Sequence, residues 1–412
     1  MGILSSKTLA GFSRGLSANV KRFSPGLHSR IKDWSAVRAA YVHVLSPISG
    51  PDMSVTLHAL RSAHLRSMPK VKGALLSAGC AGTWYFDWIK DRTGHSGRHI
   101  GIEYYTPKPH DLPAGVEWIA NTVGNMSAVG DGTCQLVFSG QNLEHLWPED
   151  VAGFFSESNR VLEDGGWLVV DSPNRLVTAP LTWSHPEHTV EFTPDEVVNV
   201  ATLAGFDVTS MVGLWTCRDA QTGRVLPFSP DPNDDKWTFA ERIAAAHDDP
   251  NNAFIWWMTA RKSRPPRVSE LKAKVDAIFA AAWPERKTRF VCGAGTKSVV
   301  DGRSIVVSDV HETGPIVYGP YMPLKAGKHF VEFTLHARGA ANPEAIVANC
   351  DVVGSQGRQI AIKAVSSADL WKTDGKVRLD FKLDDLEFGI QARCISFGVA
   401  RLECELPVVI DD

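Results

Sequence analysis

The sequence of 412 residues lacks several features that mark particular classes of protein. No apolar run approaches the roughly 18 residues of a membrane-spanning helix, which argues against an integral membrane protein. The seven cysteines show no paired spacing, so the sequence favours a reducing compartment over a disulfide framework or a structural zinc site. A formal net charge of −3 gives no overall attraction to nucleic acid or to anionic membranes.

The N-terminal stretch from Met1 to Lys32 contains no acidic residue, while its apolar residues follow a loose helical stripe. Four interpretations fit this pattern: a helix lying on a membrane surface, a transit sequence, a myristoylation site at MGILSS, or a solvated helix that packs on the next domain. We rank the packing helix first and membrane contact second. The basic residues of the stretch are Lys7, Arg14, Lys21, Arg22, Arg30 and Lys32.

The composition, with 44% hydrophobic and 22% charged residues, is ordinary for a globular protein, and the length predicts two or three domains. The pattern changes from alternating helices and strands to short strands alone near Trp283-Pro284. We therefore expect an N-terminal helical region (1–70), an α/β domain (71–264), a linker helix (265–286) and a β-sandwich or jelly roll (287–412).

The stretch GALLSAGCAGTWYFDWI, residues 73–89, predicts a short strand, a small-residue turn and an amphipathic helix. Gly79 and Gly82 allow a tight turn and a close approach of the backbone to a ligand. The first turn of the helix offers N–H groups to a polar ligand.

A second predicted strand, HIGIEYY at 99–105, carries Glu103, which lies 103 − 82 = 21 residues beyond Gly82. Roughly 20 residues is the spacing at which nucleotide-binding α/β units place a carboxylate on ribose hydroxyls. Further along the chain, a loop at 121–129 contains Asn125, and apolar strands are predicted within 134–150 and 161–175.

The order of these blocks resembles that of class I S-adenosylmethionine-dependent methyltransferases over roughly residues 73–262. LVFSGQNLEHL (136–146) is followed by VLEDGGWLVVDSPN (161–174) and then by HPEHTVEFTPDEVVNVATLAGFDV (185–208). The resemblance implies a Rossmann-like sheet with helices on both faces, one antiparallel strand near its end, and S-adenosylmethionine as cofactor with S-adenosylhomocysteine as product.

The resemblance also implies which residues hold the cofactor, and three departures from the family pattern accompany it. The family usually has an acidic residue where Ser77 stands, glycines at Ala81 and Thr83, and an acidic residue at Asn125. An asparagine side-chain oxygen still accepts from the adenine amino group. The implied cofactor contacts are Ser77, Gly79, Cys80, Ala81, Gly82, Glu103, Tyr104, Asn125, Met126, Ser139, Gly140 and Gln141.

Methyl transfer to a hydroxyl needs an aligned acceptor and a base, and histidine suits that role near neutral pH. His145 and His188 are the candidate catalytic residues, and a bonded helix residue or a capping residue is an equally good interpretation of each. Trp183, His185 and Glu191 are candidate substrate contacts. His185 and His188 together could ligate a metal, but no clear carboxylate partner accompanies them, so we predict no metal site.

The C-terminal strands include the segment GPIVYGPYMPLKAGKHFVEFTLHA (314–337), which resembles β-sandwich modules of surface-polysaccharide enzymes. Tyr318, Tyr321, Trp371 and Arg393 are candidates for a sugar platform, with core packing as the alternative for each.

We therefore expect a methyltransferase that acts on a sugar hydroxyl of a surface glycan or glycolipid. The alternatives are a small-molecule, lipid or protein acceptor, and an inactive methyltransferase fold that serves as a glycan-binding scaffold. A nicotinamide dehydrogenase is disfavoured because the complete GxGxxG motif is absent. We expect a cytoplasmic protein with no nucleic-acid partner, and contact with the inner membrane face through the basic N-terminus remains open, as does the oligomeric state.

Overall fold

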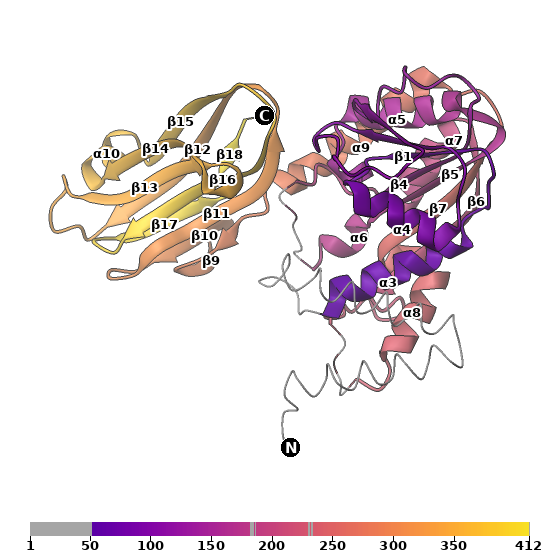
Figure 1. Ribbon diagram of the computed structural model, residues 1–412. Helices are drawn as coiled ribbons and strands as arrows, with labels where there is room; N and C mark the ends of the chain where they lie inside the picture. Colours follow the sequence, from indigo (N-terminus) through magenta and orange to yellow (C-terminus); the bar gives the residue numbers. More distant parts are fainter. Residues whose placement is uncertain (1–51, 182–184, 186, 230, 232–233, 412) are drawn as a thin grey trace, which may run out of the picture. The chain divides into compact units, whose positions relative to one another are not determined.

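A computed structural model describes residues 52–181, 185, 187–229, 231 and 234–411 (Figure 1). The predicted basic N-terminal stretch and Trp183 lie outside these ranges. The chain divides into two compact units. The first unit holds the described residues up to Asn142, Gly153–Val177 and Thr193–Arg267, and the second holds Leu143–Ala152, Thr178–Phe192 and the residues from Val268 onward.

The first unit is built on a seven-stranded sheet in the order β3-β2-β1-β4-β5-β7-β6. Strands β1 to β5 are parallel, and β7 runs antiparallel to both of its neighbours. The predicted Rossmann-like sheet and its antiparallel strand are thus confirmed. The strands are β1 (Ala74–Ala78), β2 (His99–Glu103), β3 (Val116–Ala120), β4 (Cys134–Gly140), β5 (Leu162–Pro173), β6 (Phe206–Thr216) and β7 (Ala253–Lys262).

Helices cover both faces of this sheet, with α5 and α7 on one side and α3, α4 and α8 on the other (Figure 1). Helix α7 begins with a capping box between Thr193 and Glu196 and a proline in its first turn. The helices are α3 (Asp52–Ser67), α4 (Thr83–Thr93), α5 (Pro148–Val161), α6 (Arg175–Thr178), α7 (Pro194–Leu203) and α8 (Phe239–Asp248), with the 3-10 turns η1 (Leu143–His145) and η2 (Pro250–Asn252).

Helix α3 packs on α4 through the ring of Trp88. Its indole N–H donates to the Ser62 hydroxyl at 2.8 Å, and the His58 ring stacks on the indole with centroids 4.9 Å apart. The Arg61 guanidinium lies over the same indole, 5.0 Å from its centroid. This packing fixes Arg61 in the position that it takes in the site described below.

The second unit is dominated by two antiparallel sheets, of order β15-β12-β17-β10-β9 with β18 on β12, and β14-β13-β16-β11-β8. Alternate residues of β12 are buried, including Val331, Phe333 and Leu335, which is the pattern of a strand with one face on a core. The predicted all-β region is confirmed. Its strands are β8 (Val291–Cys292), β9 (Thr296–Val300), β10 (Arg303–Ser308), β11 (Thr313–Leu324), β12 (Gly327–Arg338), β13 (Ile346–Val353), β14 (Gln359–Ser366), β15 (Lys376–Leu383), β16 (Glu387–Phe397), β17 (Arg401–Leu406) and β18 (Val409–Ile410).

Helices also belong to the second unit: α9 (Val268–Lys287), α10 (Ser367–Lys372) and the 3-10 turn η3 (Ser355–Gly357). The predicted linker helix corresponds to α9, whose residues Leu271, Val275 and Ile278 are buried as expected, whereas Val268 is exposed. Within the described ranges, none of the helices combines the length and the apolarity that crossing a bilayer requires.

Candidate active site

The turn between β1 and α4 brings the backbone close to a neighbouring side chain. Gly79 and Gly82 have φ values of 75° and 91°, a region that favours glycine. A Cβ atom built on Gly79 would lie 2.3 Å from Cγ of Asn142, so any larger residue displaces that side chain. Gly82 has no side chain to cap α4, and the Tyr85 N–H donates to the Gly82 carbonyl oxygen at 3.2 Å, so the N–H groups of Thr83 and Trp84 are the ones that can meet a polar ligand.

Three other predicted contacts lie along the same turn. Ser77 is buried, and its hydroxyl is 2.8 Å from Nε2 of His99 on β2. Burial lowers the pKa of His99 to about 3, so the imidazole is neutral and the pair carries no charge. Cys80 is buried, and burial raises the pKa of its thiol. Ala81 is exposed.

Glu103 ends β2 and holds the turn that follows it. Its Oε1 atom accepts from the backbone N–H groups of Tyr105 and Thr106, at 2.7 and 2.9 Å. Tyr104 and Tyr105 are 61% and 56% exposed, so neither residue packs in the core. The carboxylate thus has a fixed orientation at the carboxyl end of β2, where parallel sheets of this type bind ligands.

Replacing Glu103 with alanine is expected to weaken S-adenosylhomocysteine binding about tenfold or more. A hydrogen bond from a ribose hydroxyl to a carboxylate contributes roughly 1.5–3 kcal/mol, and the variant loses such bonds. Calorimetric titration of the full chain measures the effect, with Glu163→Ala as a matched control, because Glu163 is exposed at the start of β5. Equal affinity in wild type and Glu103→Ala would overturn the assignment.

The loop after β3 is held against α5. Asn125 is exposed, and its Oδ1 atom accepts from the N–H of Ser127 at 3.1 Å, so this oxygen also supports a local turn. Met126 has a buried side chain, and its N–H donates to Oε2 of Glu157 at 2.9 Å. Gly153 of α5 allows this contact, since a Cβ there would lie 2.5 Å from the carbonyl oxygen of Gly124.

Buried polar groups gather at the carboxyl ends of β4 and β5. Asp171 is fully buried and accepts from Arg61 Nε at 2.9 Å, Arg61 Nη2 at 3.2 Å and Gln141 Nε2 at 2.7 Å. Burial raises the pKa of Asp171, while the guanidinium of Arg61 acts in the opposite direction. Ser139 accepts from the Asn142 side chain at 3.1 Å.

The sequence predicts Ser139, Gly140 and Gln141 at this edge but misses Arg61, Asn142 and Asp171. A Cβ on Gly140 would lie 2.6 Å from Nη2 of Arg61, so the glycine leaves room for the guanidinium. For Asp171 the sequence does carry a signal, because an acidic residue ends the apolar run WLVVD (167–171). Nothing in the sequence near Arg61 indicates its role, because its partner Asp171 lies 110 positions further along the chain.

The second unit brings together the predicted histidines. The rings of His145 and His188 meet edge to face with centroids 4.9 Å apart, and the rings of His185 and His188 stack at 4.5 Å. His188 is buried, whereas His145 and His185 are half-buried. Burial lowers the pKa of all three, to about 3 for His185, so the imidazoles are neutral near pH 7.

Glu191, predicted as a substrate contact, is a buried partner of this cluster. The Nδ1–H of His188 donates to its Oε1 atom at 2.8 Å, and the Thr178 hydroxyl donates to its Oε2 atom in a short hydrogen bond. Burial raises the pKa of Glu191. The carboxylate therefore orients His188 and is itself 6% exposed, which leaves little surface for an acceptor.

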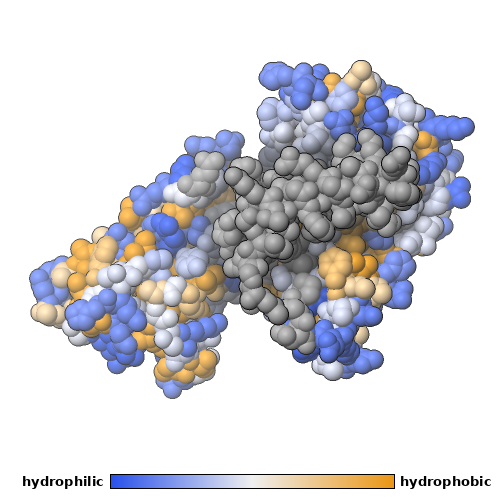
Figure 2. Space-filling model, turned by 60° about the horizontal axis from the view of Figure 1, so that its bottom comes forward, coloured by the Kyte–Doolittle hydropathy of each residue, from blue (hydrophilic) through white to orange (hydrophobic). Residues whose placement is uncertain are grey.

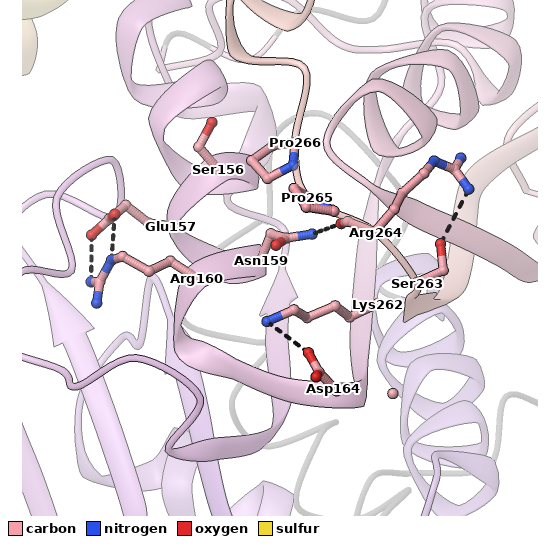
Figure 3. A pocket seen from close by; sticks show the side chains of 11 residues that line it. Ser156, Glu157, Asn159, Arg160, Asp164, Lys262, Ser263, Arg264, Pro265 and Pro266 are labelled. Atoms are coloured by element: carbon pink, nitrogen blue, oxygen red, sulfur yellow. Dashed lines mark hydrogen bonds and ion pairs between the residues drawn. The ribbon is translucent and has the colours of Figure 1, made fainter.

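A cavity of about 810 Å³ lies at the opposite edge of the sheet (Figure 3). It is lined by α5, by the start of β5 and by the residues that follow β7. Four of its charged groups form two pairs, Glu157 with Arg160 and Lys262 with Asp164. Because β5 begins here, the cavity lies at the amino end of a parallel strand, away from the edge that holds Gly79 and Asp171.

Comparison with known proteins gives a consistent picture of the first unit. Residues 76–170 match the protein family described as "Methyltransferase domain". The chain is 32% identical over 145 residues to a "probable S-adenosylmethionine-dependent methyltransferase" of Mycolicibacterium smegmatis, a match that covers 34% of this chain and 54% of that protein. It is 39% identical over 87 residues to a protein of the same description from Mycobacterium tuberculosis, covering 21% of this chain and 31% of that one.

The chain thus spans about half, or less, of the length of the curated relatives that it matches. Among solved structures, it is similar to an S-adenosylmethionine-dependent methyltransferase from Mesorhizobium loti. That comparison has 16% sequence identity and a TM-score of 0.33, and it covers 48% of this chain and 96% of the other.

Proposed function

We propose that this chain, which contains a class I S-adenosylmethionine-dependent methyltransferase domain, transfers a methyl group to a sugar hydroxyl of a surface glycan or glycolipid. The observation that carries the methyltransferase assignment is the match of residues 76–170, which span the glycine turn, Glu103 and the polar residues that end β4. The sugar acceptor is the finer part of the proposal and rests on the second unit.

The chemistry is an in-line displacement at the methyl carbon. The acceptor oxygen forms a bond to that carbon while the sulfur–methyl bond breaks, and the sulfonium becomes the thioether of S-adenosylhomocysteine. The cofactor supplies the reactivity, so the protein must hold it, align the acceptor and take up the hydroxyl proton. Glu103 is proposed to accept from the ribose hydroxyls, and the N–H groups at the start of α4 to face the polar end of the cofactor.

His145 and His188 are the proposed proton acceptors. A general base must be neutral before it acts, and burial keeps both imidazoles neutral near pH 7. Each ring is held through Nδ1, by the carbonyl oxygen of Glu187 at 3.1 Å for His145 and by the Glu191 carboxylate for His188. These contacts leave Nε2 of each ring as the basic nitrogen.

The sugar proposal is supported by polar and aromatic residues on β11 and β16. Tyr318 lies opposite Arg393 in the strand register, and the rings of Tyr318 and Tyr321 meet edge to face at 6.2 Å. Arg393 is bonded twice to Asp351, which fixes its plane beside the tyrosines. Trp371 is 87% exposed on α10, which packs on β12 and β14, so it belongs to a separate surface.

The visible face of the sandwich, on the left of Figure 2, mixes polar and apolar residues. Such a mixed face suits an acceptor with both hydroxyls and C–H faces. Aromatic rings stack on sugar C–H groups while an arginine donates to hydroxyls, and Tyr318, Tyr321 and Arg393 supply both kinds of group in one place.

The proposal predicts which cofactor binds and what product forms. Calorimetry of the full chain should show binding of S-adenosylmethionine and S-adenosylhomocysteine and none of NAD. With methyl-labelled cofactor, bacterial polysaccharide and glycolipid fractions should acquire label as a methyl ether, which survives mild alkaline hydrolysis, whereas a methyl ester does not. Tyr318→Ala should reduce labelling of long glycans more than Trp371→Ala does.

Two outcomes contradict parts of this proposal separately. Label that appears only in proteins, lipids or small molecules would reject the sugar acceptor and keep the methyltransferase. Failure to bind either form of the cofactor, in a protein that folds normally, would reject the enzyme and favour a binding scaffold built on the same fold.

A further inference from the structure

We propose that Glu144, His145 and His188 form a binding site for a divalent transition-metal ion, preferably Zn²⁺. A carboxylate oxygen of Glu144 and one ring nitrogen of each histidine all lie within 4.8 Å of one another. Ligand atoms around a tetrahedral ion with bonds of roughly 2.0–2.2 Å lie about 3.3–3.6 Å apart, so the three side chains must close in by up to about 1.5 Å to hold the ion. All three residues belong to the second unit.

Both histidines are oriented as metal-ligating histidines usually are. The Nδ1–H of His188 donates to the Glu191 carboxylate at 2.8 Å, and the Nδ1–H of His145 donates to the carbonyl oxygen of Glu187 at 3.1 Å. Each bond selects the tautomer whose lone pair is on Nε2. A carboxylate or a backbone carbonyl on the far nitrogen is the outer-shell arrangement that fixes ring orientation and raises ligand basicity at metal centres.

The backbone around these ligands is braced by one threonine. The N–H and the hydroxyl of Thr189 both donate to the carbonyl oxygen of Glu144, at 2.7 and 2.9 Å, and the same hydroxyl is 2.6 Å from the carbonyl oxygen of Leu146. Thr189 follows His188 directly, so it ties the two segments that carry the ligands. The Thr178 hydroxyl holds the second oxygen of Glu191 in turn. The set is therefore preorganised before any ion binds.

The ligand types select the class of metal. Two imidazoles and one carboxylate suit Zn²⁺ and other first-row divalent ions, whereas Mg²⁺ and Ca²⁺ prefer oxygen ligands alone. Three protein ligands also leave a further position for water or another molecule, as at catalytic rather than structural zinc sites. The sequence predicts no metal because His185 and His188 lack an evident carboxylate partner. The structure supplies one from η1, more than 40 residues earlier in the chain.

A bound ion changes the role available to the two histidines. Their Nε2 lone pairs would be engaged with the ion, so neither ring could then accept the acceptor proton directly. A bound ion would therefore exclude the base role proposed above for the two histidines, but not methyl transfer itself. Metal binding is measured without any acceptor, so its failure can be told apart from a failure of methyl transfer.

The test uses the full-length protein freed of metal by a chelator and titrated with Zn²⁺, and separately with Co²⁺ as a spectroscopic probe. Wild type should bind a single ion per chain at this site, and the Co²⁺ form should show the intense visible absorption of a tetrahedral centre without a thiolate charge-transfer band. Glu144→Gln preserves side-chain size and should weaken binding by more than about 100-fold. Glu191→Gln should weaken it by roughly 10–100-fold, as loss of an outer partner does.

Glu187→Gln is the matched control, because that side chain is exposed and the substitution keeps the backbone carbonyl that holds His145. It should bind Zn²⁺ as wild type does. Melting temperatures in chelator, similar for all variants, separate loss of the site from loss of the fold. Absence of Zn²⁺ and Co²⁺ binding by wild type overturns the proposal. So does Co²⁺ binding that persists in Glu144→Gln, or a thiolate band, which would assign the ion to the cysteines.

Discussion

Replacing His188 with glutamine is expected to lower methyl-transfer turnover by about 10²–10⁴-fold, the usual contribution of a positioned acid or base. The imidazole is buried, and burial lowers its pKa, so in wild type the ring is neutral at pH 7, as a general base must be before it acts. Glutamine is similar in length but has no basic nitrogen. His145→Gln should show this loss instead if His145 is the base, because the rings of His145 and His188 are in contact and the two residues divide proton removal and acceptor orientation between them.

The measurement is turnover at saturating cofactor, together with S-adenosylhomocysteine affinity, which both variants should retain. His311→Gln provides the control, since His311 is an exposed histidine of the same unit. If both variants keep turnover within about threefold of wild type, far less than the loss of a general base causes, the base lies elsewhere or the acceptor needs none.

Replacing Asp171 with alanine is expected to lower the free energy of unfolding of the first unit by roughly 3–5 kcal/mol. The substitution leaves the Arg61 guanidinium and the Gln141 amide without their shared acceptor. The Arg61 side chain is only 11% exposed, so water cannot readily replace the lost carboxylate. Urea denaturation, followed by a probe specific to this unit, measures the shift in midpoint.

An exposed ion pair provides the comparison that shows how much burial adds to the effect of losing a carboxylate on the free energy of unfolding. Arg98 and Glu117 form an ion pair of similar length, but their side chains are 48% and 49% exposed. Glu117→Ala should therefore change stability by no more than about 1 kcal/mol. The double variant Arg61→Met/Asp171→Leu should recover most of the loss, because buried ion pairs are often replaceable by apolar residues of similar size. A loss below about 1 kcal/mol in Asp171→Ala would mean that the site relaxes and admits water.

The parts of this structure that follow from local sequence were predictable. The strand, glycine turn and helix of 73–89 and the position of Glu103 depend on spacing within one segment, and the structure has them as expected. Strand β11 was harder to predict from the sequence, because Pro315, Pro320 and Pro323 interrupt the residue pattern that marks a strand. The structure accommodates each of these prolines at a register shift in the pairing with β16.

The contacts that define the two sites join distant segments, and a single sequence does not encode them visibly. Arg61 and Asp171 are 110 positions apart, and the carbonyl oxygen of Glu144 meets Thr189 across 45 positions. The histidines could be proposed from their residue type, whereas Glu144, the carboxylate of the proposed metal site, could not. The chemistry of single side chains can thus be predicted from local sequence, whereas tertiary packing determines which side chains come together in a site.

The glycine in the middle of α5 has a consequence for engineering this protein. Gly153 makes the helix less stable than alanine would by about 1 kcal/mol, yet a Cβ there would collide with the backbone of Gly124, beside Asn125. Selection for thermal stability would therefore not enrich helix-forming residues at this position in a variant library, because the atoms that must move are backbone atoms. A variant made to carry alanine at residue 153 should push the loop after β3 off the helix, so heat resistance and cofactor affinity should fall together.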